Sequence, residues 1–148
     1  MIVSHEGPKI LEIGGRLGGE CINSHLLPLS LGNIRPYDSL IQIIQGYNPF
    51  LPQDQMRSPQ RRAGGRALLP KNPGQIVSVK GLDEVRIHPA VRGVSQIKSE
   101  GDIVRLPDDR PFDYTIAHIV AQCDLEDSIQ QILDQVAALY SAEVSPRS

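Results

Sequence analysis

Residues 9–20 read K-I-L-E-I-G-G-R-L-G-G-E, and this stretch constrains the fold more than any other. Its first half is apolar and typical of a short strand, and its second half is a glycine-rich loop. Glu12 comes near the end of the strand, and Arg16 lies in the loop. A carboxylate, an arginine and a bare backbone within eight residues are what a site for metal-bound phosphate requires. The loop glycines are Gly14, Gly15, Gly18 and Gly19.

Composition and charge narrow the class of protein. The chain has 148 residues, of which 40% are hydrophobic, enough for one domain with a core or for two small lobes. A net charge of −2 and an aromatic content of 4% argue against binding to nucleic acid or to an anionic membrane. No apolar run approaches the ~18 residues of a membrane span. Cys21 and Cys123 lack metal-ligand spacing, so we expect a reduced, cytoplasmic chain.

The first third predicts a strand–loop–helix–helix unit. Residues 1–4 and 9–13 are expected to form an antiparallel hairpin that leads into the glycine loop. Residues 20–31 predict a helix that Pro28 kinks or ends near Leu27. The apolar face of this helix is Ile22, Leu26 and Leu29.

A second helix is predicted to start at residues 35–38, with Pro36 near its first position, and to end at Gly46. Its apolar face is Tyr37, Leu40, Ile41 and Ile44. Residues 48–62 are rich in proline and polar side chains and lack apolar periodicity, which predicts a linker or mobile loop.

The rest of the chain has the pattern of an antiparallel sheet covered by one helix, so the expected fold class is α+β. Residues 125–140 predict that helix, with Asp124 as its N-cap, and residues 141–148 are expected to be a frayed tail. In the longest strand, residues 114–122, alternate side chains are expected to share a face. The other predicted strands are 66–69, 75–80, 91–98 and 103–106.

The order and residues of these parts resemble the C-terminal portion of ATP-grasp ligases, in the branch of carboxylate–amine ligases that includes the L-amino acid ligases. The family signature, Glu-x-Asn-x-Arg-x-Gly-Gly followed by helices, stands here as E-I-G-G-R-L-G-G at residues 12–19. The resemblance covers nearly the whole chain. It implies the end of the ATP-grasp core at 1–47, a linker at 48–62 and a β-rich C-terminal subdomain with a terminal helix at 63–148.

The resemblance also implies roles for the loop residues. Glu12 would be a carboxylate ligand to the Mg²⁺ ions on the ATP phosphates, and Arg16 would be the catalytic residue that faces the transferred phosphate. Gly14, Gly18 and Gly19 would let the backbone approach the cofactor. Gly14 stands where the family has a metal-binding Asn, so that ligand is missing or replaced by water. The alternative for Glu12 and Arg16 is a surface ion pair that flanks a glycine turn.

By resemblance, the complete enzyme phosphorylates a carboxylate with ATP and joins the acyl phosphate to an amine. The ATP-gripping lysines, the hinge and a partner acidic residue that precede the motif in the family have no counterpart in this sequence. We therefore expect a C-terminal fragment that is inactive alone. The alternative is a non-catalytic truncated or split module for dimerisation or subunit docking. The expected partners are small-molecule substrates and a second copy or an N-terminal ATP-grasp subunit, with neither nucleic acid nor membrane.

Several other side chains have a functional interpretation and a simpler one. His25 is expected to be a hydrogen-bonded helix histidine rather than a substrate ligand, and His118 a satisfied core histidine. Cys21, near a helix start, is either a stabilised thiolate or an inert buried thiol, the latter being expected. Lys98 lacks the flanking methionines of a biotinyl site. A basic cluster is interpreted as a phosphate lid or, preferably, a solvated linker: Arg57, Arg61, Arg62 and Arg66.

Overall fold

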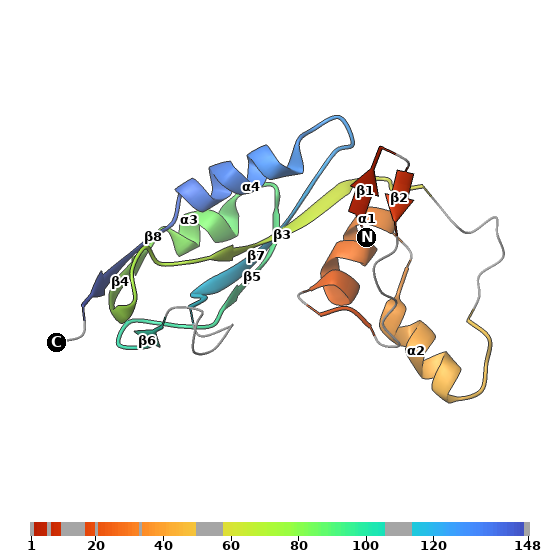
Figure 1. Cartoon of the computed structure of the whole chain (residues 1–148), viewed down its shortest axis with the longest axis horizontal. Coiled ribbons are helices and arrows are strands. Elements are labelled where there is room, and N and C mark those ends of the chain that lie inside the picture. The colour runs from red at the N-terminus through yellow and green to blue at the C-terminus, as the bar shows by residue number, and fades with distance from the viewer. Residues whose placement is uncertain are drawn as a thin grey trace.

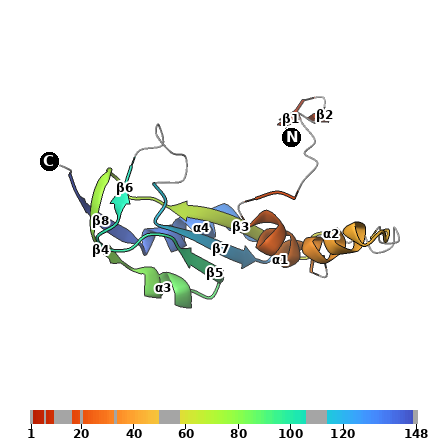
Figure 2. The same cartoon turned by 90° about the horizontal axis from the view of Figure 1, so that it is seen from below.

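The computed structural model describes residues 2–5, 7–9, 17–19, 21–32, 34–49, 58–105 and 114–146. A hairpin and two helical segments precede a β-rich part that contains two sheets and two further helices (Figure 1). The strand β8 (Ser141–Ser145) lies at the opposite end of the molecule from the helix α2 (Pro36–Ile44) in both views (Figure 1 and Figure 2). None of the helices in these ranges is long and apolar enough to cross a membrane.

The predicted N-terminal hairpin is present. β1 (Ile2–Ser4) pairs antiparallel with β2 (Gly7–Lys9), so the second arm begins two residues earlier than the sequence predicted. Beyond Lys9, the predicted arm lies outside the described residues.

The first helix changes type at the position of its proline. η1 (Ile22–Leu26) is a π-helical turn, in which the Leu26 N–H donates to the Cys21 carbonyl, and α1 (Leu27–Leu31) follows it directly. Pro28 has no N–H to donate, and a wide turn beside it is a common way to accommodate such a gap in a helix. The helix therefore does not end near Leu27, as one of the two predicted outcomes had it, but continues through Pro28 to Leu31 after a change of helix type.

The second helix, α2, begins at Pro36 as predicted and is followed by Gly46 in a left-handed conformation with φ 84°. Its apolar face is not buried. Tyr37, Leu40, Ile41 and Ile44 are 51%, 39%, 53% and 76% exposed.

One antiparallel sheet is built around β7 (Ala117–Cys123), with β3 (Arg62–Leu68) and β5 (Val91–Gln96) on its two sides. Side chains alternate along β7 as predicted, although the strand starts three residues later than the pattern suggested. Ala117, Ile119 and Ala121 are fully buried on one face. His118, Val120 and Gln122 alternate with them.

Two helices, not the single predicted one, cover that buried face (Figure 1). α3 (Leu82–Ile87) contributes Leu82 and Val85, and α4 (Ile129–Ala138) contributes Leu133 and Val136. Gly64 of β3 permits the approach of α4, because a Cβ there would meet the Ile129 side chain at 2.8 Å. The helix α3 escaped prediction because six residues are too few to display a helical period.

The second sheet has the order β6–β4–β8, with β4 (Gly74–Lys80) at its centre and β6 (Ile103–Val104) at one edge. The predicted frayed tail is wrong, because β8 pairs antiparallel with β4 from Lys80↔Ser141 to Gln75↔Ser145. The buried Ile116 links the sheets, since its N–H donates to the Leu68 carbonyl. The strand order in both sheets requires contacts between distant segments, which local patterns do not encode.

The start of α4 also differs from the prediction. The helix begins at Ile129, and the Ser128 hydroxyl accepts a hydrogen bond from the Gln131 N–H at 3.4 Å. Asp124, the predicted N-cap, instead forms an ion pair with Arg61 at 3.5 Å. Both residues are good caps, and only the path of the chain after β7 decides between them.

We expect Ser128→Ala to lower the free energy of unfolding by about 1 kcal/mol, because the Gln131 N–H loses its acceptor. Asp124→Ala is the matched control, since exposed ion pairs of this kind contribute about 0–1 kcal/mol. Chemical denaturation of both variants measures the difference. A larger loss for Asp124→Ala would place the start of the helix where the sequence predicted it.

Candidate functional site

The described end of the glycine loop, Gly18 and Gly19, is hydrogen-bonded to η1. Asn23 Nδ2 donates to the Gly18 carbonyl at 2.6 Å, and the Ile22 N–H donates to the Gly19 carbonyl at 3.1 Å. Of the predicted site residues, Gly18 and Gly19 are therefore placed directly before the helical turn. Glu12, Gly14 and Arg16 lie outside the described residues, so their predicted roles remain predictions.

Asn23 is a positioning residue that sequence reasoning missed. Its side chain is only 6% exposed, and burial of an amide is costly unless it is hydrogen-bonded. Gly18 accommodates it closely, because a Cβ at position 18 would lie 3.2 Å from Asn23 Nδ2. An Asn shortly after a glycine loop was the available signal, since its short amide readily bonds nearby backbone groups.

Cys21 makes the turn between the loop and η1. Its φ of 65° is left-handed, which is uncommon for a residue other than glycine and costs of the order of 1–3 kcal/mol. The Cys21 carbonyl accepts hydrogen bonds from both the His25 and Leu26 N–H groups at 2.9 Å. Cys21 is half-buried and not buried as expected, while its expected inertness stays a prediction.

A cleft of about 380 Å³ opens between this turn and the sheet, and we call it the η1 cleft. It lies between the π-helical turn and the strands β3 and β7. Apolar and small residues line most of it. The lining includes Cys21, Ile22, Leu26, Gly65, Ala67 and Val120, together with Thr115 and His118.

The histidines behave differently from each other. His25 is exposed and shares a hydrogen bond of 2.8 Å with the Ser24 hydroxyl, which confirms the simpler expectation for it. His118 is half-buried and lines the η1 cleft. Because His118 is half-buried, it does not belong to the core in which the sequence placed it.

The predicted basic cluster does not act as one unit. Arg61 pairs with Asp124, and Arg66 pairs with Asp134 of α4. Arg62 and Arg66 belong to β3, not to a linker, and Arg57 lies outside the described residues. The half-buried Lys98 donates to the Ile103 carbonyl at 2.9 Å, a structural contact.

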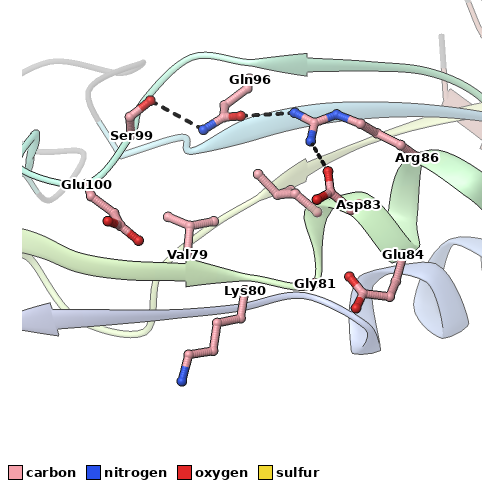
Figure 3. A pocket seen from close by; sticks show the side chains of 10 residues that line it. Val79, Lys80, Gly81, Asp83, Glu84, Arg86, Gln96, Ser99 and Glu100 are labelled. Atoms are coloured by element: carbon pink, nitrogen blue, oxygen red, sulfur yellow. Dashed lines mark hydrogen bonds and ion pairs between the residues drawn. The ribbon is translucent and has the colours of Figure 1, made fainter.

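A larger cleft, with a volume of about 700 Å³, lies at the start of α3 (Figure 3). Its central polar groups bind one another: Arg86 donates to Asp83 at 2.7 Å and to Gln96 at 3.0 Å. Lys80 points away from this network in Figure 3. Because these groups already satisfy each other, the cleft is a weaker candidate than the η1 cleft despite its size.

In the part of the chain that the structure describes, two groups have pKa values shifted by burial, and both have a structural explanation. Burial raises the pKa of the Cys123 thiol, with a smaller contribution from Asp127 in the same direction. Burial also raises the pKa of Tyr140 to about 12, and its hydroxyl has no hydrogen-bond partner among the described atoms. Both side chains pack in the β-rich part.

No group of three or more His, Cys, Asp or Glu residues in the described ranges is placed to hold a metal ion.

A family model described as L-amino acid ligase C-terminal domain 2 matches residues 66–145, more than half of the chain. The chain belongs to this family. Two solved structures share its fold. The L-amino acid ligase from Bacillus licheniformis has a TM-score of 0.76 and 19% identity, over 95% of this chain and 35% of that one. The phosphoribosylglycinamide synthetase from Anaerococcus prevotii has a TM-score of 0.71 and 17% identity, over 97% of this chain and 35% of that one.

The L-amino acid ligase C-terminal domain 2 assignment confirms the resemblance to the C-terminal portion of ATP-grasp ligases and the α+β fold class. No curated protein sequence matches the chain. The chain spans about a third of the length of both solved proteins. The matched segment comprises β3 from Arg66 onward through β8, so it holds one wall of the η1 cleft, and the glycine loop precedes it.

We expect Asn23→Ala to lower the free energy of unfolding by about 0.5–1.5 kcal/mol, because the part-buried hydrogen bond to the Gly18 carbonyl is lost. Ser24→Ala, at the neighbouring exposed position, should change it by less than about 0.5 kcal/mol. Chemical denaturation gives both values, and amide hydrogen exchange at Gly18 and Gly19 reports the release of the loop. Equal effects of the two substitutions would show that Asn23 does not hold the loop.

Proposed function

We propose that this chain provides one wall of the active site of an ATP-dependent carboxylate–amine ligase. The observation that carries the proposal is the match to L-amino acid ligase C-terminal domain 2, preceded in the same chain by the E-I-G-G-R-L-G-G motif. In the proposed reaction, a carboxylate oxygen attacks the γ-phosphorus of ATP and ADP leaves. The amine then attacks the acyl phosphate, phosphate leaves, and the nitrogen loses a proton.

Glu12 and Arg16 are the residues that we propose to serve the phosphoryl step. A carboxylate beside a triphosphate is repelled unless Mg²⁺ bridges them, and Mg²⁺ usually takes one or two protein carboxylates. Arg16 would bind the transferred phosphoryl group through two parallel N–H bonds. Gly14, Gly18 and Gly19 would bring backbone to the cofactor. The attachment of Gly18 to Asn23 supports a loop held in one place.

The metal would need ligands beyond this wall. The described residues provide no cluster that fits Mg²⁺, and Glu12 alone is half of a carboxylate pair. Since the chain spans 35% of the solved ligases, we propose that residues other than these 148 grip ATP. We keep the division into residues 1–47, 48–62 and 63–148 as part of this proposal.

The second candidate function is a non-catalytic module that docks on another subunit or on a second copy. The exposed apolar face of α2 favours it, since a row of apolar side chains on one helix is a typical contact surface. Under this alternative, the glycine loop would be only a turn between the hairpin and the first helix, and it would bind no metal. The two candidates differ in whether Glu12 matters for chemistry.

We expect Glu12→Gln to abolish ATP-dependent ligation while leaving the fold intact, because the amide loses the charge that binds Mg²⁺. Release of ADP and phosphate that depends on both carboxylate and amine is the assay, on the chain with its native partners. Glu143→Gln, at an exposed position of β8, is the control and should retain activity. Full turnover by Glu12→Gln would remove Glu12 from the site.

The 148 residues by themselves are expected to bind no ATP in the presence of Mg²⁺, as measured by calorimetry. The physical reason is that one carboxylate and one arginine offer too few contacts to a triphosphate. Micromolar binding by the isolated chain would refute the proposal that other residues complete the site.

A further inference from the structure

We propose that the η1 cleft receives the apolar side chain of the carboxylate substrate and that Gly65 sets the size it admits. This inference rests on the ligase function proposed above. The cleft begins where the glycine loop ends: Cys21 and Ile22 line it, and the Ile22 N–H is bonded to the Gly19 carbonyl. A carboxylate activated at the loop would therefore carry its side chain toward the cleft.

The size and lining of the cleft suit a small apolar group. Its volume of about 380 Å³ is at the lower end of the ~300–1,000 Å³ typical of small-molecule sites. Leu26, Ala67 and Val120 present hydrocarbon to it. Ile22 is 42% exposed, so apolar surface at the cleft would be removed from water by a ligand.

The charges near the cleft argue against a phosphate as its occupant. Arg66 is the one charged residue among the described residues that line it, and its guanidinium binds Asp134 of α4. An anion in the cleft would have to compete with that carboxylate for the arginine. A neutral side chain meets no such competition.

Thr115 and His118 bring a hydroxyl and an imidazole to the cleft. Thr115 is only 3% exposed, and His118 is half-buried. Because a hydroxyl and an imidazole can each donate or accept a hydrogen bond, these two would orient a substrate that carries a donor or acceptor beside its apolar group.

Gly65 controls the width of the cleft. It lies on β3 without a left-handed backbone, and an added Cβ would meet only the Ile119 carbonyl at 3.6 Å, an ordinary contact. A larger side chain would thus occupy the cleft without straining the strand. Gly93 on β5 is a matched control, since nothing lies within 4 Å of an added Cβ and it does not line the cleft.

The first experiment titrates leucine and glycine into the chain and follows backbone and imidazole resonances by NMR. Leucine is expected to shift the signals of Thr115, His118 and Val120 more than glycine does, and Gly65→Val should remove this difference while Gly93→Val preserves it. Equal shifts by the two ligands, or shifts that survive Gly65→Val, would overturn the inference. The NMR titration does not require turnover, so it tests whether the η1 cleft binds an apolar side chain even if the chain does not catalyse ligation.

The second experiment measures KM for leucine and for glycine as the carboxylate substrate in the ligation assay. Gly65→Val should raise KM for leucine at least tenfold and KM for glycine less than twofold, because a few methylenes in an apolar pocket discriminate by roughly 10–200-fold. An unchanged leucine-to-glycine ratio would defeat the inference while leaving the ligase function standing. Glu12→Gln tests the ligase function through loss of ligation. The leucine-to-glycine ratio of KM tests the role of Gly65, and Gly93→Val, as the control, should leave that ratio unchanged.

Discussion

The pairing of β7 with strands on both sides is the constraint on which the rest of the structure depends. Ile119 and Ala121 of β7 have no exposed surface, because β3, β5, α3 and α4 all meet there. A strand buried so completely must satisfy all of its backbone groups within the protein. His118 and Val120, which alternate with these residues, line the η1 cleft.

The connection between the glycine loop and this sheet is made by a few buried polar contacts. Asn23 holds the Gly18 carbonyl, and Gln122 of β7 donates to the Leu29 carbonyl at 2.7 Å. The first bond is local, because it spans five residues, whereas the second joins segments 93 residues apart. Asn23 is buried, so breaking its bond would leave a buried amide unsatisfied, and the two bonds together are expected to couple the loop to the sheet face.

The two candidate functions place different demands on the exposed surfaces. A ligase needs the glycine loop and the η1 cleft to face a common substrate, whereas a docking module needs only the apolar face of α2. The two are compatible in physical terms, since α2 and the η1 cleft use different side chains. A chain that spans about a third of the solved ligases can contribute both a site wall and a contact surface.

The sequence by itself determined the local features: the hairpin, the change of helix type next to Pro28, the limits of α2, the alternation along β7 and the loop motif that resembles the ATP-grasp signature. Each depends on neighbouring residues, such as a proline without an N–H or a period of two. Only the tertiary structure decided the rest. It drew residues 141–145 into a sheet with β4, joined Gln122 of β7 to the Leu29 carbonyl, and made Ser128 the cap of α4 through the path of the chain after β7. These outcomes follow from burial and from contacts between distant segments, whose energies no local pattern contains.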